Sequence, residues 1–177
     1  MSRRPIYLAI SRLNRSQRAH FAIFVPNEAD ADKDPNDRDV TCKGTLIHVV
    51  GTPMTGFVHE FKRNHDCGQA QPPRTVVNLG SVDAAHISKP SYKTPSGDDI
   101  GWGALDKIAL QVAAPRKSED SLAPVDDLSN RRCQEWTMDY LRRLVEKGYI
   151  QSEAIAIAQS ERDAPTHGIG LRSAGQR

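Results

Sequence analysis

Residues 130–150 have the hydrophobic spacing of a helix packed on a core. Asn130 can cap the start of this helix through its side-chain oxygen, and Gly148 supplies the left-handed residue at which helices end. The apolar or small residues recur at steps of three and four: Cys133, Trp136, Thr137, Tyr140, Leu141, Leu144 and Val145. The pattern predicts a half-buried helix with Cys133 in its first turn and with Trp136 and Tyr140 as core residues.

Upstream of this helix, the pattern changes to the apolar runs and alternation typical of strands. We expect five strands, at 5–11, 19–26, 44–51, 56–63 and 74–82. The second strand is apolar on both faces, which favours a central position in the sheet. Consecutive strands usually pair as neighbours, and the third and fourth are joined by a short turn, so the predicted sheet is antiparallel.

Two more helices are predicted, at 104–114, ended by Pro115, and at about 152–159, capped by Ser152. Strands followed by helices indicate an α+β fold, an antiparallel sheet of about five strands covered on one side by helices. A length of 177 residues fits one domain, which we place at 1–162, followed by a flexible C-terminal tail at 163–177.

Composition narrows the possible partners and compartments. A net charge of +2 gives no reason to expect nucleic-acid binding, and no apolar run is long enough for stable membrane insertion. Three cysteines without paired spacing fit a reducing compartment better than a disulfide framework. We therefore expect a cytoplasmic protein. N-terminal organelle targeting is the alternative, because the first twenty residues carry five arginines and no acid.

The chain has no convincing metal motif. Residues 30–41 begin like a calcium-binding loop, but Pro35 and Thr41 replace the glycine and glutamate that such a loop requires. We interpret the acidic segment around it as a solvated, mobile loop. The two histidines and one cysteine at 59–67 match no zinc spacing. No metal and no cofactor is expected.

Cys133 is the candidate nucleophile. In the first turn of a helix, free N–H groups and the helix dipole favour an anion, and Arg131 and Arg132 add positive charge. These effects can lower the pKa of a thiol and favour the reactive thiolate. The simpler interpretation is that Cys133 is a small core residue.

A thiolate nucleophile needs a base, and the base needs a third polar group that orients its ring. His20 lies on the predicted central strand and His48 on the next long strand. If these strands are antiparallel neighbours, the two histidines can lie side by side on the face covered by the Cys133 helix.

The ordered set of HFAIFVP with His20, LIHVVG with His48 and RCQEW with Cys133 resembles the circularly permuted papain-like (NlpC/P60-type) proteins, which include the lecithin:retinol acyltransferase-like enzymes and the PPPDE peptidases. The chain also looks like small fungal proteins of unknown function with similar segments. The resemblance implies a permuted papain-like fold and a cysteine-dependent hydrolase or acyltransferase acting on an amide, ester or thioester.

In the mechanism that the resemblance implies, Cys133 forms the acyl-enzyme, His20 is the base and His48 orients it. Gln134 and the Cys133 N–H are candidates for binding the oxyanion, and Trp102, in a Gly-flanked loop, is a candidate substrate contact. The expected substrate is a small molecule, a lipid or a peptide.

The sequence also departs from the acyltransferase-like pattern. Arg132 stands where those members usually have Asn, and an acidic loop separates the two histidines. Two alternatives therefore stay open. One is a non-catalytic binding or scaffold protein on the same fold, and the other is a cysteine/histidine acid–base enzyme of small-molecule metabolism.

Overall fold

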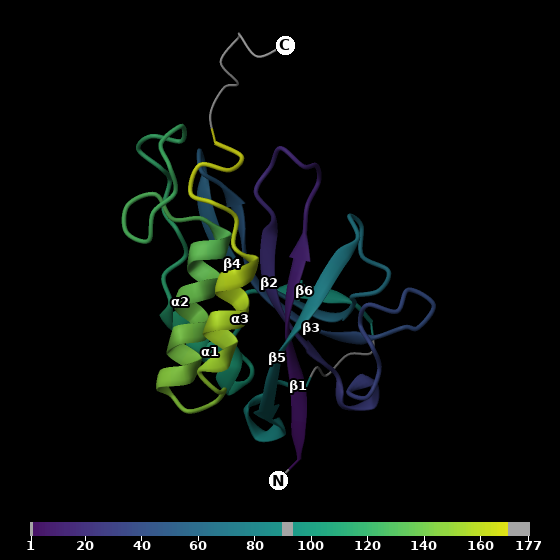
Figure 1. Cartoon of the computed structure of the whole chain (residues 1–177). Coiled ribbons are helices and arrows are strands. Elements are labelled where there is room, and N and C mark those ends of the chain that lie inside the picture. Colours follow the sequence, from purple (N-terminus) through teal and green to yellow (C-terminus); the bar gives the residue numbers. More distant parts are fainter. Residues whose placement is uncertain (1, 90–93, 170–177) are drawn as a thin grey trace.

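The computed structural model describes residues 2–89 and 94–169. Its helices lie on one side of a single sheet (Figure 1). The strands are β1 (Arg3–Ser11), β2 (His20–Pro26), β3 (Lys43–Thr52), β4 (Gly56–Asp66), β5 (Arg74–Asp83) and β6 (Ser96–Asp98), and the helices are α1 (Ala104–Gln111), α2 (Cys133–Glu146) and α3 (Glu153–Glu161). Short 3-10 turns follow β2 (Glu28–Asp30) and β5 (Ala84–His86).

The sheet has the strand order β5-β1-β2-β3-β4-β6, and every neighbouring pair is antiparallel. The predicted α+β class, the antiparallel sheet and the interior position of β2 are confirmed. The sequence pattern missed β6, which pairs along the outer edge of β4. A strand of three residues in a turn-rich segment carries no hydrophobic alternation, so only its partner strand reveals it.

The main core fills the space between the sheet and the three helices. Phe21 and Ile23 of β2 belong to it, as do Trp136 and Tyr140 of α2, which are fully buried as predicted. The ring of Trp136 stacks on Tyr140, and its indole N–H donates to Val112 O at 2.9 Å. These contacts fix α2 across β2 and β3.

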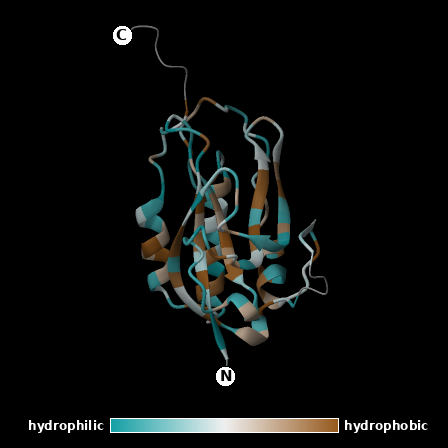
Figure 2. Cartoon of the chain, turned by 90° about the vertical axis from the view of Figure 1, so that its right-hand side faces the viewer, coloured by the Kyte–Doolittle hydropathy of each residue, from teal (hydrophilic) through white to brown (hydrophobic). Residues whose placement is uncertain are grey.

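The opposite face of the sheet carries a second, smaller apolar cluster. Ala22 and Phe24 of β2 and Leu46 of β3 form its centre, together with two buried cysteines. Hydrophobic positions follow the central strands, and hydrophilic positions dominate the connections between them (Figure 2).

The acidic segment after β2 is exposed at most of its positions, as predicted, but polar contacts attach it over the second cluster. Asp30 is buried and pairs with Lys33, and the Asn36 side chain bonds to both backbone groups of Val76. The segment has no hydrophobic periodicity because polar side chains, rather than apolar ones, attach it.

Helix α2 begins at Cys133, which confirms the placement of this residue in the first turn. The expected cap was wrong. Arg132 is the N-cap residue, and Glu135 accepts from its backbone N–H at 3.0 Å. Asn130 instead donates to carbonyl groups of the preceding loop. Gly148 has a φ of 71° and ends the helix as expected.

The segment after α3 is attached to the domain as far as the structure describes it. Asp163 pairs with Arg12 at 2.8 Å, and the Val125 N–H donates to Pro165 O. These contacts involve the first residues of the predicted tail at 163–177, and residues 170–177 of that prediction lie outside the described residues.

No helix within residues 2–89 and 94–169 is long and apolar enough to cross a membrane.

Candidate functional site

The sulfur of Cys133 lies against the first residues of β2. Sγ is 3.8 Å from Ala19 O, and the backbone N–H groups of Phe21 and Gln134 donate to it. Strand β2 pairs with β3 only from Ile23 onward, so this part of β2 is free on the β3 side to receive the thiol. Cys133 therefore contacts the backbone on both sides of His20.

The thiol is protonated in this environment. Burial raises the pKa of Cys133 above its ordinary value and outweighs the backbone hydrogen bonds and Arg18, which lower it. The Gln134 N–H at the helix start does act to lower this pKa, as expected, but burial outweighs it, so the expected net lowering of the pKa was wrong. Arg131 and Arg132, which were expected to supply positive charge, instead bond to Asp139 and to Ser121 O.

The two histidines form a hydrogen-bonded chain with a glutamate. His20 Nε2 lies 2.8 Å from His48 Nδ1, and His48 Nε2 lies 2.9 Å from Glu60 Oε1. The structure thus brings His20 and His48 together, as their places on neighbouring strands predict. Glu60, which the sequence reasoning missed, is the end of the chain.

The carboxylate determines which ring nitrogens carry protons. Burial, above all, lowers the pKa of both His20 and His48 to about 3, so each ring is neutral with one N–H. An ionised carboxylate only accepts, so we assign the His48 proton to Nε2, which leaves Nδ1 to accept from His20 Nε2–H. His20 Nδ1 is then an unprotonated nitrogen, and it has no hydrogen bond within the described residues.

The histidines do not project toward the helices, and this part of the prediction was wrong. Along β2, His20 alternates with Phe21 of the main core and shares a face with Ala22 of the second cluster. Both histidines line a hollow of about 360 Å³ on that face. Cys133 packs on the main core and is not among the residues that line the hollow. In the described chain no hydrogen bond joins Cys133 to either ring.

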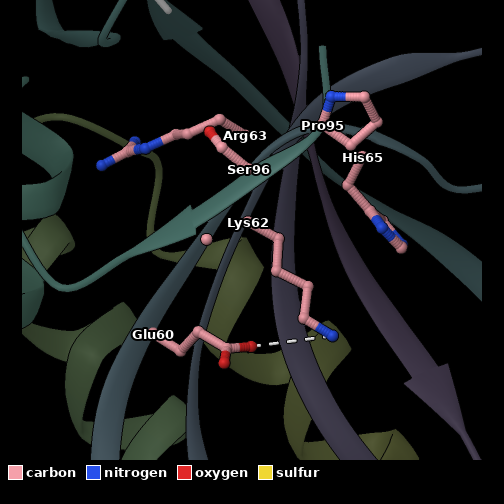
Figure 3. Close-up of a pocket in the computed structure, with 7 residues that line it drawn as sticks. Glu60, Lys62, Arg63, His65, Pro95 and Ser96 are labelled. Atoms are coloured by element: carbon pink, nitrogen blue, oxygen red, sulfur yellow. Dashed lines mark ion pairs between the residues drawn. The ribbon is translucent and has the colours of Figure 1, made fainter.

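Three basic side chains line the same hollow: Arg18, Lys62 and Arg74. Lys62 lies 3.6 Å from Glu60, and both side chains project from the same side of β4, away from Arg63 (Figure 3). Lys62 also lines an adjoining pocket with His65. The site is therefore basic, which the small net charge of the chain did not indicate.

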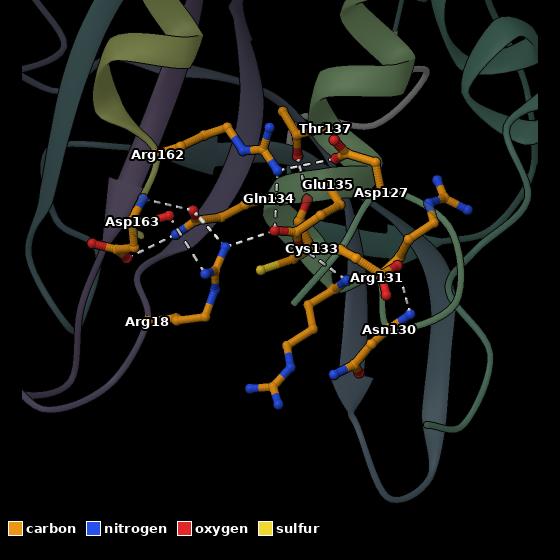
Figure 4. A network of polar contacts seen from close by, with 12 residues as sticks. Arg18, Asp127, Asn130, Arg131, Cys133, Gln134, Glu135, Thr137, Arg162 and Asp163 are labelled. Carbon is orange, nitrogen blue, oxygen red and sulfur yellow. Dashed lines mark hydrogen bonds and ion pairs between the residues drawn. The ribbon is translucent and has the colours of Figure 1, made fainter. Parts of the chain in front are cut away.

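Gln134 is not available for an oxyanion. Its Nε2 donates to Ala19 O and to Asp163 Oδ2, both at 2.9 Å, and its Oε1 accepts from Arg18 and from the Asp163 N–H, both at 3.0 Å (Figure 4). The side chain is fully buried and all its hydrogen-bonding capacity is used. Gln134 instead clamps α2 to β2 and to the segment after α3, so its predicted role was wrong.

Trp102 also lies elsewhere. Its backbone N–H donates to Asp106 of α1, and Arg63 lies over its ring at 5.9 Å. It does not line the hollow that contains the histidines. Trp102 is exposed beside α1 and apart from the histidines, so its role as a substrate contact stays a prediction.

The missed residues differ in how far the sequence could reveal them. Counting back from the turn between β3 and β4 pairs His48 with Glu60, which is the observed register. The predicted hairpin of β3 and β4 therefore already placed Glu60 opposite His48. Arg74 enters the site because β5 pairs with β1, and that pairing joins strands far apart in the sequence.

The other two cysteines are poor nucleophiles. Burial raises the pKa of Cys42 to about 12 and that of Cys67 to about 11. Among residues 2–89 and 94–169, no three His, Cys, Asp or Glu side chains are grouped to hold a metal ion.

The arrangement can perform acid–base chemistry. His20 Nδ1 can take a proton from a thiol or from water, and the Glu60 carboxylate, which acts to raise the pKa of His20, can stabilise the charge that His20 then carries. This is the capacity that a nucleophilic mechanism requires.

Comparison with known proteins gives a family and no activity. No solved structure matches the chain. The match to a protein family extends over residues 6–151, which includes His20, His48, Glu60, Arg74 and Cys133. The chain thus belongs to DUF6540, a family of unknown function.

Proposed function

We propose that the protein is a cysteine-dependent hydrolase or acyltransferase of the permuted papain-like kind, acting on an amide, ester or thioester. Cys133 attacks the acyl carbon, His20 takes the thiol proton at Nδ1, and the leaving group departs with a proton returned by His20. Water or an acceptor then releases the acyl group from Cys133, again with His20 as base.

One observation carries the proposal. The chain from Glu60 through His48 occupies Nε2 of His20 and leaves Nδ1 as the free basic nitrogen, while the thiol contacts the backbone on both sides of His20. Catalytic hydrogen bonds are often long or absent without substrate and form in the complex. The mechanism requires a movement that brings the His20 ring, which lines the hollow, to the thiol, which packs on the main core.

The resting site is a neutral pair rather than a thiolate and an imidazolium. The raised pKa of Cys133 and the lowered pKa of His20 both favour this state. Proton transfer therefore accompanies attack on the substrate. The backbone N–H groups at the start of α2 take the role of stabilising the oxyanion, because Gln134 is fully engaged.

A binding protein without turnover is the second candidate. The observation in its favour is that Cys133 has a raised pKa and makes no hydrogen bond to a basic side chain of residues 2–89 and 94–169. On this alternative the hollow holds a ligand and Cys133 is a core residue.

Hydrolysis of 4-nitrophenyl acetate, an activated ester, separates the two candidates. We expect the wild type to release 4-nitrophenolate faster than buffer, and Cys133→Ala and His20→Ala to reduce this rate to the buffer rate. Cys42→Ala is the matched control, because it removes a buried thiol of the second cluster. A wild-type rate equal to that of Cys133→Ala would remove the enzymatic proposal and leave the binding one.

A further inference from the structure

The residues that line the hollow beside the histidines include three basic side chains and no acidic one. The basic side chains are Arg18, Lys62 and Arg74. The positive charge of Arg74 and Lys62 also contributes to the lowered pKa of both histidines.

Two of the three cations have partners within the protein. Arg18 Nη2 lies 2.7 Å from Glu135 Oε1 and also donates to Gln134 (Figure 4). Lys62 lies 3.6 Å from Glu60. These contacts account for the charge on both side chains.

Among the described residues, Arg74 has no such partner. Its Nε and Nη1 atoms are buried and make no hydrogen bond, and no carboxylate among the described residues lies within ion-pair distance of it. Buried polar groups in native proteins are almost always satisfied, and an unsatisfied charged group needs a physical explanation. An anion held in the hollow that Arg74 lines would offset this uncompensated charge and is such an explanation.

The guanidinium group also restricts the chemistry of that ligand. Its N–H groups form a planar fork that matches the paired oxygens of a carboxylate or a phosphate. An anion at this position is also attracted by Lys62, which lines the same hollow.

The position of Arg74 determines how far a bound anion lies from the reacting atoms. Arg74 on β5 pairs with Ser11 on β1, and Ser11 pairs with His20 on β2. Neighbouring strands lie about 4.8 Å apart, so the strand carrying Arg74 runs about 10 Å from the strand carrying His20. The anion thus lies several bonds from the acyl carbon.

We propose that Arg74 and Lys62 bind a carboxylate or phosphate group carried by the substrate, so that the enzyme selects anionic acyl compounds. The acyl part of this inference rests on the proposed function, whereas the anion site does not. Carboxylate and phosphate share the chemistry that Arg74 recognises, and the test distinguishes them.

Binding is measured without catalysis, on full-length Cys133→Ala protein, by calorimetric titration with succinate and separately with inorganic phosphate. We expect at least one anion to bind, and Arg74→Gln to weaken that binding by about tenfold or more, the loss expected for a charge-assisted hydrogen bond. The tighter of the two ligands identifies the group. Arg116→Gln, an exposed arginine outside the hollow, is the matched control.

Absence of binding by both anions, or binding that Arg74→Gln does not weaken, overturns the anion site. Circular dichroism and thermal unfolding of each variant verify that it is folded. Arg74→Lys keeps the charge without the fork and should recover part of the affinity, which a merely unfolded variant would not do.

A second measurement compares the kcat/KM of mono-4-nitrophenyl succinate with that of 4-nitrophenyl acetate. We expect the wild type to favour the anionic ester and Arg74→Gln to lower this ratio by about tenfold. If neither ester is hydrolysed but Arg74 still determines anion binding, the proposed function fails and the anion site stands. If both esters are hydrolysed and the ratio of their kcat/KM values is the same in Arg74→Gln as in the wild type, the proposed function stands and the anion inference fails.

Discussion

At the scale of single residues, the site depends on how two neutral histidines share their protons. Glu60 accepts from His48, and His48 accepts from His20, so the carboxylate at one end of the chain determines the basic nitrogen at the other. The same ordering principle operates where a carboxylate holds a catalytic histidine in one tautomer. In the proposed mechanism, His20 is the base, and His48 and Glu60 are positioning residues.

Glu60→Gln tests this ordering. A glutamine can either accept from or donate to His48, so both tautomers of the chain become accessible and the fraction with a free His20 Nδ1 falls. We expect kcat for 4-nitrophenyl acetate to fall on the order of tenfold or more, with little change in KM. Thermal unfolding should shift little, because Glu60 is partly exposed.

Glu119→Gln is the control for this substitution, since Glu119 is exposed and lies outside the chain of hydrogen bonds. An unchanged kcat in Glu60→Gln would show that the carboxylate does not order the histidines. Equal losses in both variants would show a general effect of charge.

At the scale of elements, α2 presents Cys133 and must therefore begin and end at fixed residues. Glu135 accepts from the Arg132 N–H at the start, and at the end the N–H groups of Gly148 and Tyr149 donate to carbonyls of the last turn. The buried clamp at Gln134 attaches the first turn to β2. Together these contacts determine where the sulfur lies along β2.

Gly148→Ala tests the end of this helix. Gly148 has a φ of 71°, a conformation that costs other L-residues about 1 kcal/mol, and a Cβ there meets no neighbouring atom. We expect the free energy of unfolding, measured in urea, to fall by about 1 kcal/mol from backbone strain alone. Gly97→Ala is the control, because it also has open space around it but lacks a positive φ. Equal changes in both variants would contradict this account.

Most elements could be predicted because each has a long hydrophobic pattern of its own. Five strands and three helices follow from periodicity, and the contact between His20 and His48 follows from the pairing of consecutive strands. The pKa of Cys133 could not be predicted, because it depends on how deeply β2 and α2 enclose the sulfur. Arg74 could not be placed, because β5 crosses to pair with β1.

At the scale of the whole molecule, buried titratable groups make stability depend on pH. His20 and His48 have a pKa of about 3 in the folded protein, and burial lowers that of His65 to about 4. In the unfolded chain each titrates near about 6.5. Between these values the unfolded chain binds more protons, so stability falls as the pH falls.

We therefore expect the Tm to decrease on acidification from roughly pH 7 to roughly pH 4.5, and the decrease to be smaller in the double variant His20→Gln/His48→Gln. Protonation of His65 accounts for the pH dependence of the Tm that remains in the double variant. The carboxylate of Asp163 contributes only at lower pH. Although burial acts to raise its pKa, hydrogen bonds from Arg12 and the Ala19 N–H hold it at about 2.

Gly148→Ala serves as the comparison for the pH series, because it lowers stability and leaves all the histidines in place. Its Tm should lie below that of the wild type and fall with pH by the same amount. A double histidine variant with the full pH dependence of the wild type would contradict the assignment of two buried neutral rings.

The central claim, that Cys133 forms an acyl-enzyme with His20 as base, is tested most directly by trapping that intermediate. The wild type is mixed with 4-nitrophenyl acetate, quenched in acid within the first turnover and digested for peptide mass spectrometry. We expect an acetyl group on Cys133, absent from Cys42 and Cys67 and greatly reduced on Cys133 in His20→Ala. Hydrolysis of the ester with no acetyl group on Cys133, or an acetylated Cys133 at the same level without His20, would contradict the claim.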